Sequence, residues 1–148
     1  MKIGMITDSL GNLSFEEMLR ASAELGLETL EFACGNWSSA PHIDLAAMLD
    51  SAAARSEFVA KVQDHGLTIA ALNCSGNPLH PGSQGKKHHQ VTQDTIRLAS
   101  LMGIDRVVMM SGLPGGPGDA NPNWIITDWP PECADIQRYQ WDDCIIPY

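Results

Sequence analysis

Five polar side chains of this sequence have types and positions that suit the binding of a hydroxylated ligand and the movement of a proton. They are Glu31, Asn36, His42, Asn73 and His80. A carboxylate such as that of Glu31 can in principle take a proton from carbon. Asparagine and histidine side chains can fix hydroxyl groups by hydrogen bonds. We therefore take these five as candidate substrate-binding residues and assign no catalytic residue.

The run Leu67–Leu72 predicts the strand that positions two of these candidates. It is apolar and is bounded by Gly66 and by a Ser-Gly-Asn-Pro turn, which is typical of a strand buried on both faces. Such strands belong to parallel sheets, whose ligands bind beyond the carboxyl ends of the strands. Asn73 and His80 follow this run, and we expect them to face one cavity together with Glu31.

The run Leu27–Ala33 predicts a second strand, in which alternation places Glu31 on the face opposite to Phe32. Asn36 and His42 lie in the loop that follows. Three of the candidates also have a structural alternative. Glu31 could be a hydrogen-bonded interior carboxylate, and His42 could cap the next helix. Asn73 could be a plain turn residue.

Strand and helix patterns alternate four times along the chain. The expected strands are residues 2–7, 27–33, 67–72 and 105–110, and the expected helices are 15–25, 45–51, 53–65, 88–102 and 131–143. Gly26, Gly66 and Gly103 end helices directly before strands, whereas the loops after strands are long. This asymmetry is typical of a (β/α)₈ barrel, which usually needs about 250 residues. We therefore predict an α/β fold in which residues 1–148 form one domain. It is a (β/α)₄ half barrel with parallel strands and outer helices, truncated before its second half.

A half barrel leaves one sheet face and two strand edges uncovered. The concave face is expected to carry Ile3, Met5, Thr29, Glu31, Ile69 or Ala70, and Val107 or Val108. An exposed Leu or Val side chain forgoes roughly 1.5–3 kcal/mol of burial free energy. Unpaired edges also invite pairing with another chain. We therefore expect a homo-oligomer or a complementing half barrel to cover the sheet.

The composition argues against several classes of partner. Nine Lys and Arg against 18 Asp and Glu give a net charge of −9, which repels a nucleic-acid backbone. No apolar run reaches the roughly 18 residues of a membrane span, and the N-terminus does not resemble a signal peptide. The four cysteines lack CxxC spacing, which favours reduced thiols. We expect a cytoplasmic protein whose ligand is a small molecule.

The other histidines and a glycine-rich segment have simpler interpretations. His88 and His89 stand at an expected helix start and should be solvated, and His65 at a helix C-terminus suits the helix dipole. The segment SGLPGGPGD, residues 111–119, could cradle a phosphate through its backbone amides. Because it lacks the Walker lysine, a flexible loop that shapes a pocket is the preferred interpretation.

Five segments of the chain carry a family resemblance. They are MITDSLG (5–11), ELGLETLEF (24–32), CGNWSSAPH (34–42), ALNCSGNPLHP (71–81) and MSGLPGG (110–116). With these segments the sequence resembles the sugar phosphate isomerase/epimerase family of xylose isomerase-like TIM barrels, over its whole length. The segments GNWSSAPH and LNCSGNPLHP are similar to one branch of that family, whereas the strand–helix periodicity alone is not specific.

The resemblance implies a barrel that binds a divalent metal, Mn, Mg, Co or Zn, and shifts a proton and a carbonyl between neighbouring carbons of a sugar or sugar phosphate. The family's ligands are two Glu, one Asp and one His at strand ends in the second half of the barrel. No position of this chain matches them, so the isolated chain is expected to be inactive. Its matching residues, the five candidates above, are those of the substrate-side wall.

Three other functions stay open at this point. The chain could be a non-catalytic half-barrel subunit that associates with itself or with a catalytic partner. It could belong to a lyase or hydratase that acts on a keto-sugar or glycoside with the same barrel site. A DNA-repair nuclease is a third possibility because relatives on this fold cut abasic DNA, although the charge of −9 opposes it.

Overall fold

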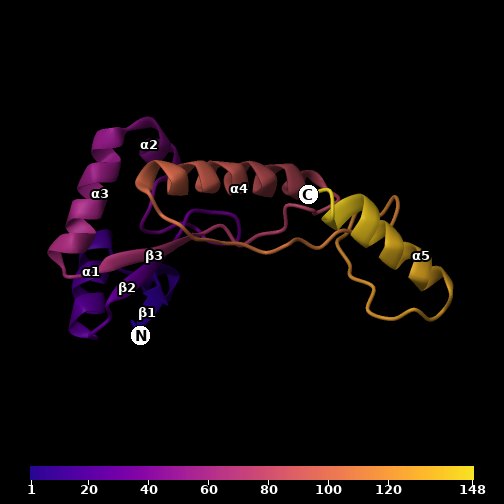
Figure 1. Cartoon of the computed structure of the whole chain (residues 1–148), viewed down its shortest axis with the longest axis horizontal. Helices are drawn as coiled ribbons and strands as arrows, with labels where there is room; N and C mark the ends of the chain where they lie inside the picture. Colours follow the sequence, from indigo (N-terminus) through magenta and orange to yellow (C-terminus); the bar gives the residue numbers. More distant parts are fainter. The chain divides into compact units, whose positions relative to one another are not determined.

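The computed structural model describes all residues, Met1–Tyr148, and its elements alternate between strands and helices (Figure 1). The strands are β1 (Gly4–Ile6), β2 (Thr29–Ala33), β3 (Thr68–Asn73) and β4 (Val107–Val108). The α-helices are α1 (Phe15–Glu24), α2 (Leu45–Asp50), α3 (Ala52–Asp64), α4 (Ser83–Met102) and α5 (Glu132–Arg138). A 3₁₀ helix, η1 (Thr7–Leu10), follows β1, and a π-helix, η2 (Tyr139–Ile145), follows α5. None of these helices is both long and apolar enough to span a bilayer.

The chain divides into two compact units. The first consists of Met1–Ser75 and Val91–Met109, and the second of Gly76–Gln90 and Met110–Tyr148. All four strands lie in the first unit and form one parallel sheet in the order β1-β2-β3-β4. Parallel neighbours in chain order, joined through helices, confirm the predicted α/β architecture.

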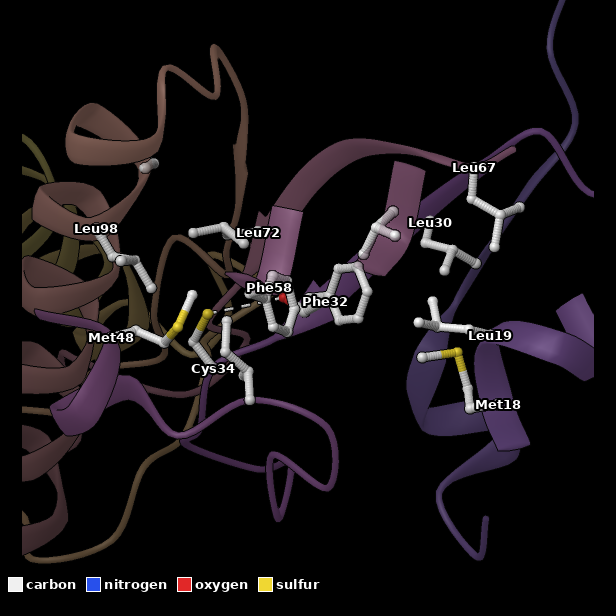
Figure 2. Packing of buried hydrophobic residues seen from close by; sticks show 13 residues of the cluster. Met18, Leu19, Leu30, Phe32, Cys34, Met48, Phe58, Leu67, Leu72 and Leu98 are labelled. Atoms are coloured by element: carbon white, nitrogen blue, oxygen red, sulfur yellow. Dashed lines mark hydrogen bonds between the residues drawn. The ribbon is translucent and has the colours of Figure 1, made fainter. Parts of the chain in front are cut away.

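The core of the first unit forms where helices cover one face of the sheet. Leu30 and Phe32 on β2 are fully buried and belong to the same cluster as Met18 and Leu19 on α1 (Figure 2). The ring of Phe32 meets that of Phe58 on α3 edge-on, with centroids 4.9 Å apart. The predicted alternation is therefore confirmed, because Phe32 points into this core and the neighbouring Glu31 is only half-buried.

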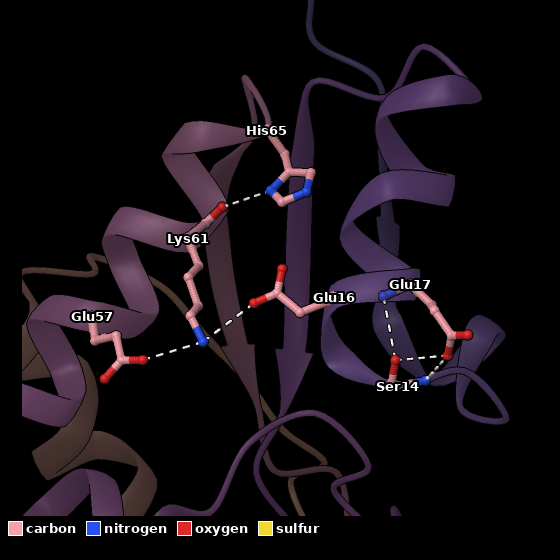
Figure 3. A network of polar contacts seen from close by, with 6 residues as sticks. All are labelled: Ser14, Glu16, Glu17, Glu57, Lys61 and His65. Atoms are coloured by element: carbon pink, nitrogen blue, oxygen red, sulfur yellow. Dashed lines mark hydrogen bonds and ion pairs between the residues drawn. The ribbon is translucent and has the colours of Figure 1, made fainter.

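Polar contacts at the surface fix α1 and α3 (Figure 3). Ser14 and Glu17 form a capping box at the start of α1, as the sequence spacing predicts. Lys61 on α3 forms ion pairs with Glu16 and Glu57, both at 3.2 Å. Because all these side chains are well exposed, each pair contributes at most about 1 kcal/mol.

A β-bulge in β3 decides which of its side chains face the helices. Leu30 pairs with Ile69, but Glu31 pairs with Ala71, so Ala70 is an extra residue in the strand. Both Ile69 and Leu72 can therefore contact the helix-side core, although they are three residues apart. The bulge also shifts Asn73 to the face that carries Glu31, because Asn73 lies two residues beyond Ala71, the partner of Glu31.

The inner face differs in part from the expected one. Gly4 and Ile6 pair with Thr29 and Glu31, so it is Gly4 and Ile6, and not Ile3 and Met5, that share the inner face. The expectation for Ile3 and Met5 was wrong because alternation in one strand does not reveal its register with the next. Of the two remaining alternatives, Ala70 lines the inner hollow, and Val107 contacts the core, which leaves Val108 inside.

Several element boundaries also differ from the expected ones, among them those of α4 and β4. Helix α4 begins at Ser83 instead of residue 88, although its first turns contain polar residues and Gly85. A Cβ atom on Gly85 would lie 2.2 Å from the His80 carbonyl oxygen, so close packing requires glycine at this position. Strand β4 has only two residues instead of six, since it has a neighbour on one side alone.

Candidate functional site

Glu31 and Asn73 meet at the carboxyl ends of β2 and β3. The Asn73 side-chain amide nitrogen Nδ2 donates a hydrogen bond of 2.6 Å to Glu31 Oε1. Asn73 Oδ1 accepts a hydrogen bond of 2.7 Å from the Ser75 backbone N–H. Both polar ends of Asn73, which is only 7% exposed, are thus engaged, and its side chain is fixed. The second carboxylate oxygen of Glu31, Oε2, has no partner within the protein.

The inner face beside Glu31 is hollow. A cavity of about 230 Å³ is lined by Thr29, Glu31, Ala70 and β1. The hydroxyl oxygen of Thr29 is buried and has no hydrogen-bond partner. The hollow is thus bordered by the Glu31 carboxylate, a group that hydrogen-bonds hydroxylated molecules, whereas the Thr29 hydroxyl lies buried behind the surface.

Asn36 holds the loop after β2 against the loop after β3. Its Nδ2 donates to the Cys74 carbonyl oxygen at 2.7 Å, and the Trp37 N–H donates to the Ser75 carbonyl oxygen at 3.1 Å. Asn36 has a φ of 65°, a left-handed conformation that asparagine tolerates better than most residues. These contacts extend the pairing of β2 and β3 beyond the strand ends and support the position of Asn73.

His42 is buried away from this pair. Its Nε2 lies 3.1 Å from the carbonyl oxygen of Leu13, in the segment between η1 and α1, and its Nδ1 is buried without a hydrogen bond. The contact ties the loop after β2 to the start of α1. No hydrogen bond joins His42 to Glu31 or Asn73, and its role in substrate binding stays a prediction.

His80 belongs to the second unit. Its Nδ1 accepts a hydrogen bond of 2.9 Å from the Gly82 N–H, so Nε2 carries the ring proton when the ring is neutral. The residue lines an open cavity of about 590 Å³ together with Lys86, His89 and Tyr148. The structure therefore joins two of the five candidates, Glu31 and Asn73, directly, and a shared cavity with His80 stays a prediction.

Sequence reasoning missed Asn77 and misjudged His88. Asn77 Oδ1 accepts from the Leu113 N–H at 2.7 Å, and Asn77 Nδ2 donates to the Leu113 carbonyl oxygen at 2.8 Å. The Asn77 N–H donates to His88 Nδ1 at 2.8 Å. His88 is 5% exposed, so the expectation that it is solvated was wrong. That expectation came from the predicted helix start at residue 88. In the structure α4 begins five residues earlier, and the His88 side chain is buried.

The glycine-rich loop already contains an acceptor for one of its amides. Asp119 Oδ2 accepts hydrogen bonds from the Gly116 N–H at 2.8 Å and from Asn123 Nδ2 at 2.9 Å. These two bonds, first that from Asn123 and then that from Gly116, lower the pKa of the Asp119 carboxyl below its usual value. A carboxylate thus holds a donor that a phosphate would need, which favours the structural interpretation of the loop.

All four cysteines are free thiols, and two of them are buried in the first unit. Burial raises the pKa of the Cys34 thiol to about 12, and burial likewise raises the pKa of Cys74. Because the thiolate is the reactive form, neither residue is a candidate nucleophile.

A thiol-labelling experiment tests this assignment. With a disulfide reagent at pH 8, we expect Cys133 and Cys144 to react first, because they are partly exposed. The pKa of about 12 leaves Cys34 with a thiolate fraction about 1,000-fold below that of an ordinary thiol. All four should react equally in denaturant. Four equally fast thiols in the native protein would contradict the burial of Cys34 and Cys74.

The side chains of this chain do not fit the divalent metal that the resemblance implies. No group of three or more His, Cys, Asp or Glu residues comes together so that it could hold a metal ion. The one carboxylate of the candidate pair, Glu31, has an amide as its partner. A metal site of the expected composition would therefore need ligands from outside this chain.

Comparison with known proteins identifies the family. The sequence model of the xylose isomerase-like TIM barrel family matches residues 19–140. This chain belongs to that family. The resemblance is thereby confirmed, and so is the fold class, since four parallel strands with their helices form half of such a barrel.

One relative is longer than this chain, and the alignment shows how much of that relative the chain covers. The chain is 52% identical over 151 aligned residues to the "Uncharacterized protein YfiH" of Bacillus subtilis (strain 168). The match covers 100% of this chain and 48% of that protein. The chain thus spans about half the length of this relative.

Proposed function

We propose that this family member forms the N-terminal half of a metal-dependent sugar or sugar phosphate isomerase or epimerase and supplies the substrate-side wall. The observation that carries the proposal is the Glu31–Asn73 pair, held by a hydrogen bond of 2.6 Å at the carboxyl ends of adjacent parallel strands. Membership of a xylose isomerase-like family supports this class of reaction. The four free thiols support a reducing, cytoplasmic location.

The reaction moves a proton beside a carbonyl group, and its substrate must be held by several hydrogen bonds. In this proposal Glu31 Oε2 accepts a hydrogen bond from a substrate hydroxyl, while Asn73 holds the carboxylate in place through Oε1. Asn73 is a positioning residue, since its own amide is engaged by Glu31 and Ser75. The base and the family's metal, for which this chain has no ligand group, would come from the complementing half.

Complementation tests this proposal. The chain is coexpressed with the part of the Bacillus subtilis relative that it does not cover, and conversion of ketoses is assayed with Mn²⁺. We expect turnover by the pair and little turnover by the chain alone. Glu31→Gln should lower kcat/KM by about 10- to 100-fold, because a hydrogen bond to a charged group contributes about 1.5–3 kcal/mol.

Glu24→Gln is the matched control, because Glu24 is an exposed residue at the end of α1 and its substitution should leave kcat/KM unchanged. Strong metal-dependent turnover by the chain alone would show that it holds a complete site. An active pair that is insensitive to Glu31→Gln would remove Glu31 from the substrate wall. A stable pair with no turnover on any sugar would contradict the proposed reaction.

A further inference from the structure

The sheet of the first unit has two open edges. Strand β1 pairs only with β2, and β4 pairs only with β3. Apolar side chains at both edges remain in contact with solvent, with Ile3 61% and Val108 39% exposed. An eight-stranded barrel would close these edges with four further parallel strands. The register of the sheet indicates whether a second copy of this chain could supply them.

One row of paired residues crosses the whole sheet. Ile6 pairs with Glu31, and Glu31 pairs with Ala71. Leu72 pairs with Val107, so the residue beside Ala71 is Arg106, and the Leu72 N–H donates to the Arg106 carbonyl oxygen at 3.1 Å. The row places Arg106 on the same inner face as Ile6 and Glu31.

Closure by a second copy would continue this row onto the copy's β1. The family's barrels have a shear of about 8 residues, so crossing four of the eight strands shifts the row by about 4 residues. A shift toward the C-terminus would place β1 of the copy beside residues of α4, which are helical. The shift must therefore run toward the N-terminus. Lys2 lies four residues before Ile6, where the row starts, so the row that passes through Arg106 reaches Lys2 of the copy.

Self-closure thus places like charges opposite each other on the inner face, twice because of the twofold symmetry. Neither Lys2 nor Arg106 takes part in an ion pair, and both are exposed. The nearby Asp105 does not compensate, because it shares the helix-facing side with Val107. Like charges directly opposite destabilise strand pairing, whereas opposite charges stabilise it. Two copies would also combine net charges of −9 each.

We propose that the open edges are closed by a different half barrel, whose two edge strands carry Asp or Glu on the inner face opposite Lys2 and Arg106. A second copy of this chain is not the partner. This inference goes beyond the proposed function and rests on the register of the sheet, so it holds or fails whatever reaction the completed barrel catalyses.

Charge reversal at Lys2 tests the proposal, because it should strengthen association with a second copy and weaken association with the different half barrel. In sedimentation velocity we expect the wild-type chain to remain a monomer at micromolar concentration. Lys2→Glu should strengthen self-association by about 10- to 100-fold, because two like-charge pairs become two opposite-charge pairs. The same substitution should weaken capture of the uncovered half of the Bacillus subtilis relative by about tenfold.

The double variant Lys2→Glu with Arg106→Glu is the control, because it restores like charges and should lose the gained self-association. A tight wild-type dimer would overturn the proposal. A Lys2→Glu variant that associates with itself no more strongly than the wild type would also overturn it. The same holds if Lys2→Glu leaves capture of the uncovered half of the relative unchanged. Turnover is not measured in this experiment, so its failure is distinguishable from failure of the proposed isomerase activity.

Discussion

Phe32→Ala is expected to lower the free energy of unfolding by about 3–5 kcal/mol, which is the usual cost of truncating a buried phenylalanine. Phe32 is fully buried, and its ring lies 4.9 Å from that of Phe58 and 6.2 Å from that of Phe15, measured between centroids. The substitution removes a side chain of β2 whose ring packs against rings of both α1 and α3. Urea denaturation followed by circular dichroism measures the change.

The control for this prediction is Leu25→Ala, at the C-terminal end of α1. Leu25 is 67% exposed, so its truncation should change the stability by no more than about 0.5 kcal/mol. Equal losses for the two variants would show that Phe32 does not occupy the core of the sheet. Because β2 also carries Glu31, a loss confined to Phe32→Ala would tie the position of the candidate site to this core.

Asn77→Ala should loosen the second unit. The substitution leaves the N–H and the carbonyl oxygen of Leu113 without their partner, and each lost hydrogen bond costs about 0.5–1.5 kcal/mol. Leu113 is 38% exposed, so its N–H is open to solvent once the bond to Asn77 is lost. Hydrogen exchange at the Leu113 amide should become much faster, which mass spectrometry of native protein can follow.

Asn121→Ala is the matched control, because Asn121 is exposed and its side chain makes no hydrogen bond in the structure. Exchange at Leu113 should stay slow in this variant. If Asn77→Ala left the exchange of Leu113 unchanged, other contacts would hold the loop after β4, and the prediction would be wrong.

The sequence predicted the elements well where local signals and the fold agree. Glycines after α1, α3 and α4 mark the helix ends, since Gly26, Gly66 and Gly103 all have positive φ angles. Alternation along β2 correctly separated Glu31 from Phe32, because one face of the sheet contacts helices. The strand-end position of Asn73 likewise predicted that it lies near Glu31, and the hydrogen bond between them confirms this placement.

Features that depend on tertiary structure could not be predicted in this way. The bulge at Ala70 turns Asn73 toward Glu31, and no local signal in the run of Ile, Ala and Leu marks it. The early start of α4 depends on contact between Gly85 and His80, which sequence periodicity does not reveal. The burial of His88 follows from that start, and so does its bond with Asn77.

The central claim is that Glu31 and Asn73 act as one unit of a substrate wall, and a double-mutant cycle in the complemented barrel tests it most directly. The cycle compares kcat/KM for Glu31→Gln, for Asn73→Ala and for the double variant. Because Asn73 acts on the substrate only through the carboxylate that it positions, the double variant should lose about as much as Glu31→Gln alone. If the two losses multiplied instead, the residues would act independently, and the account would be contradicted.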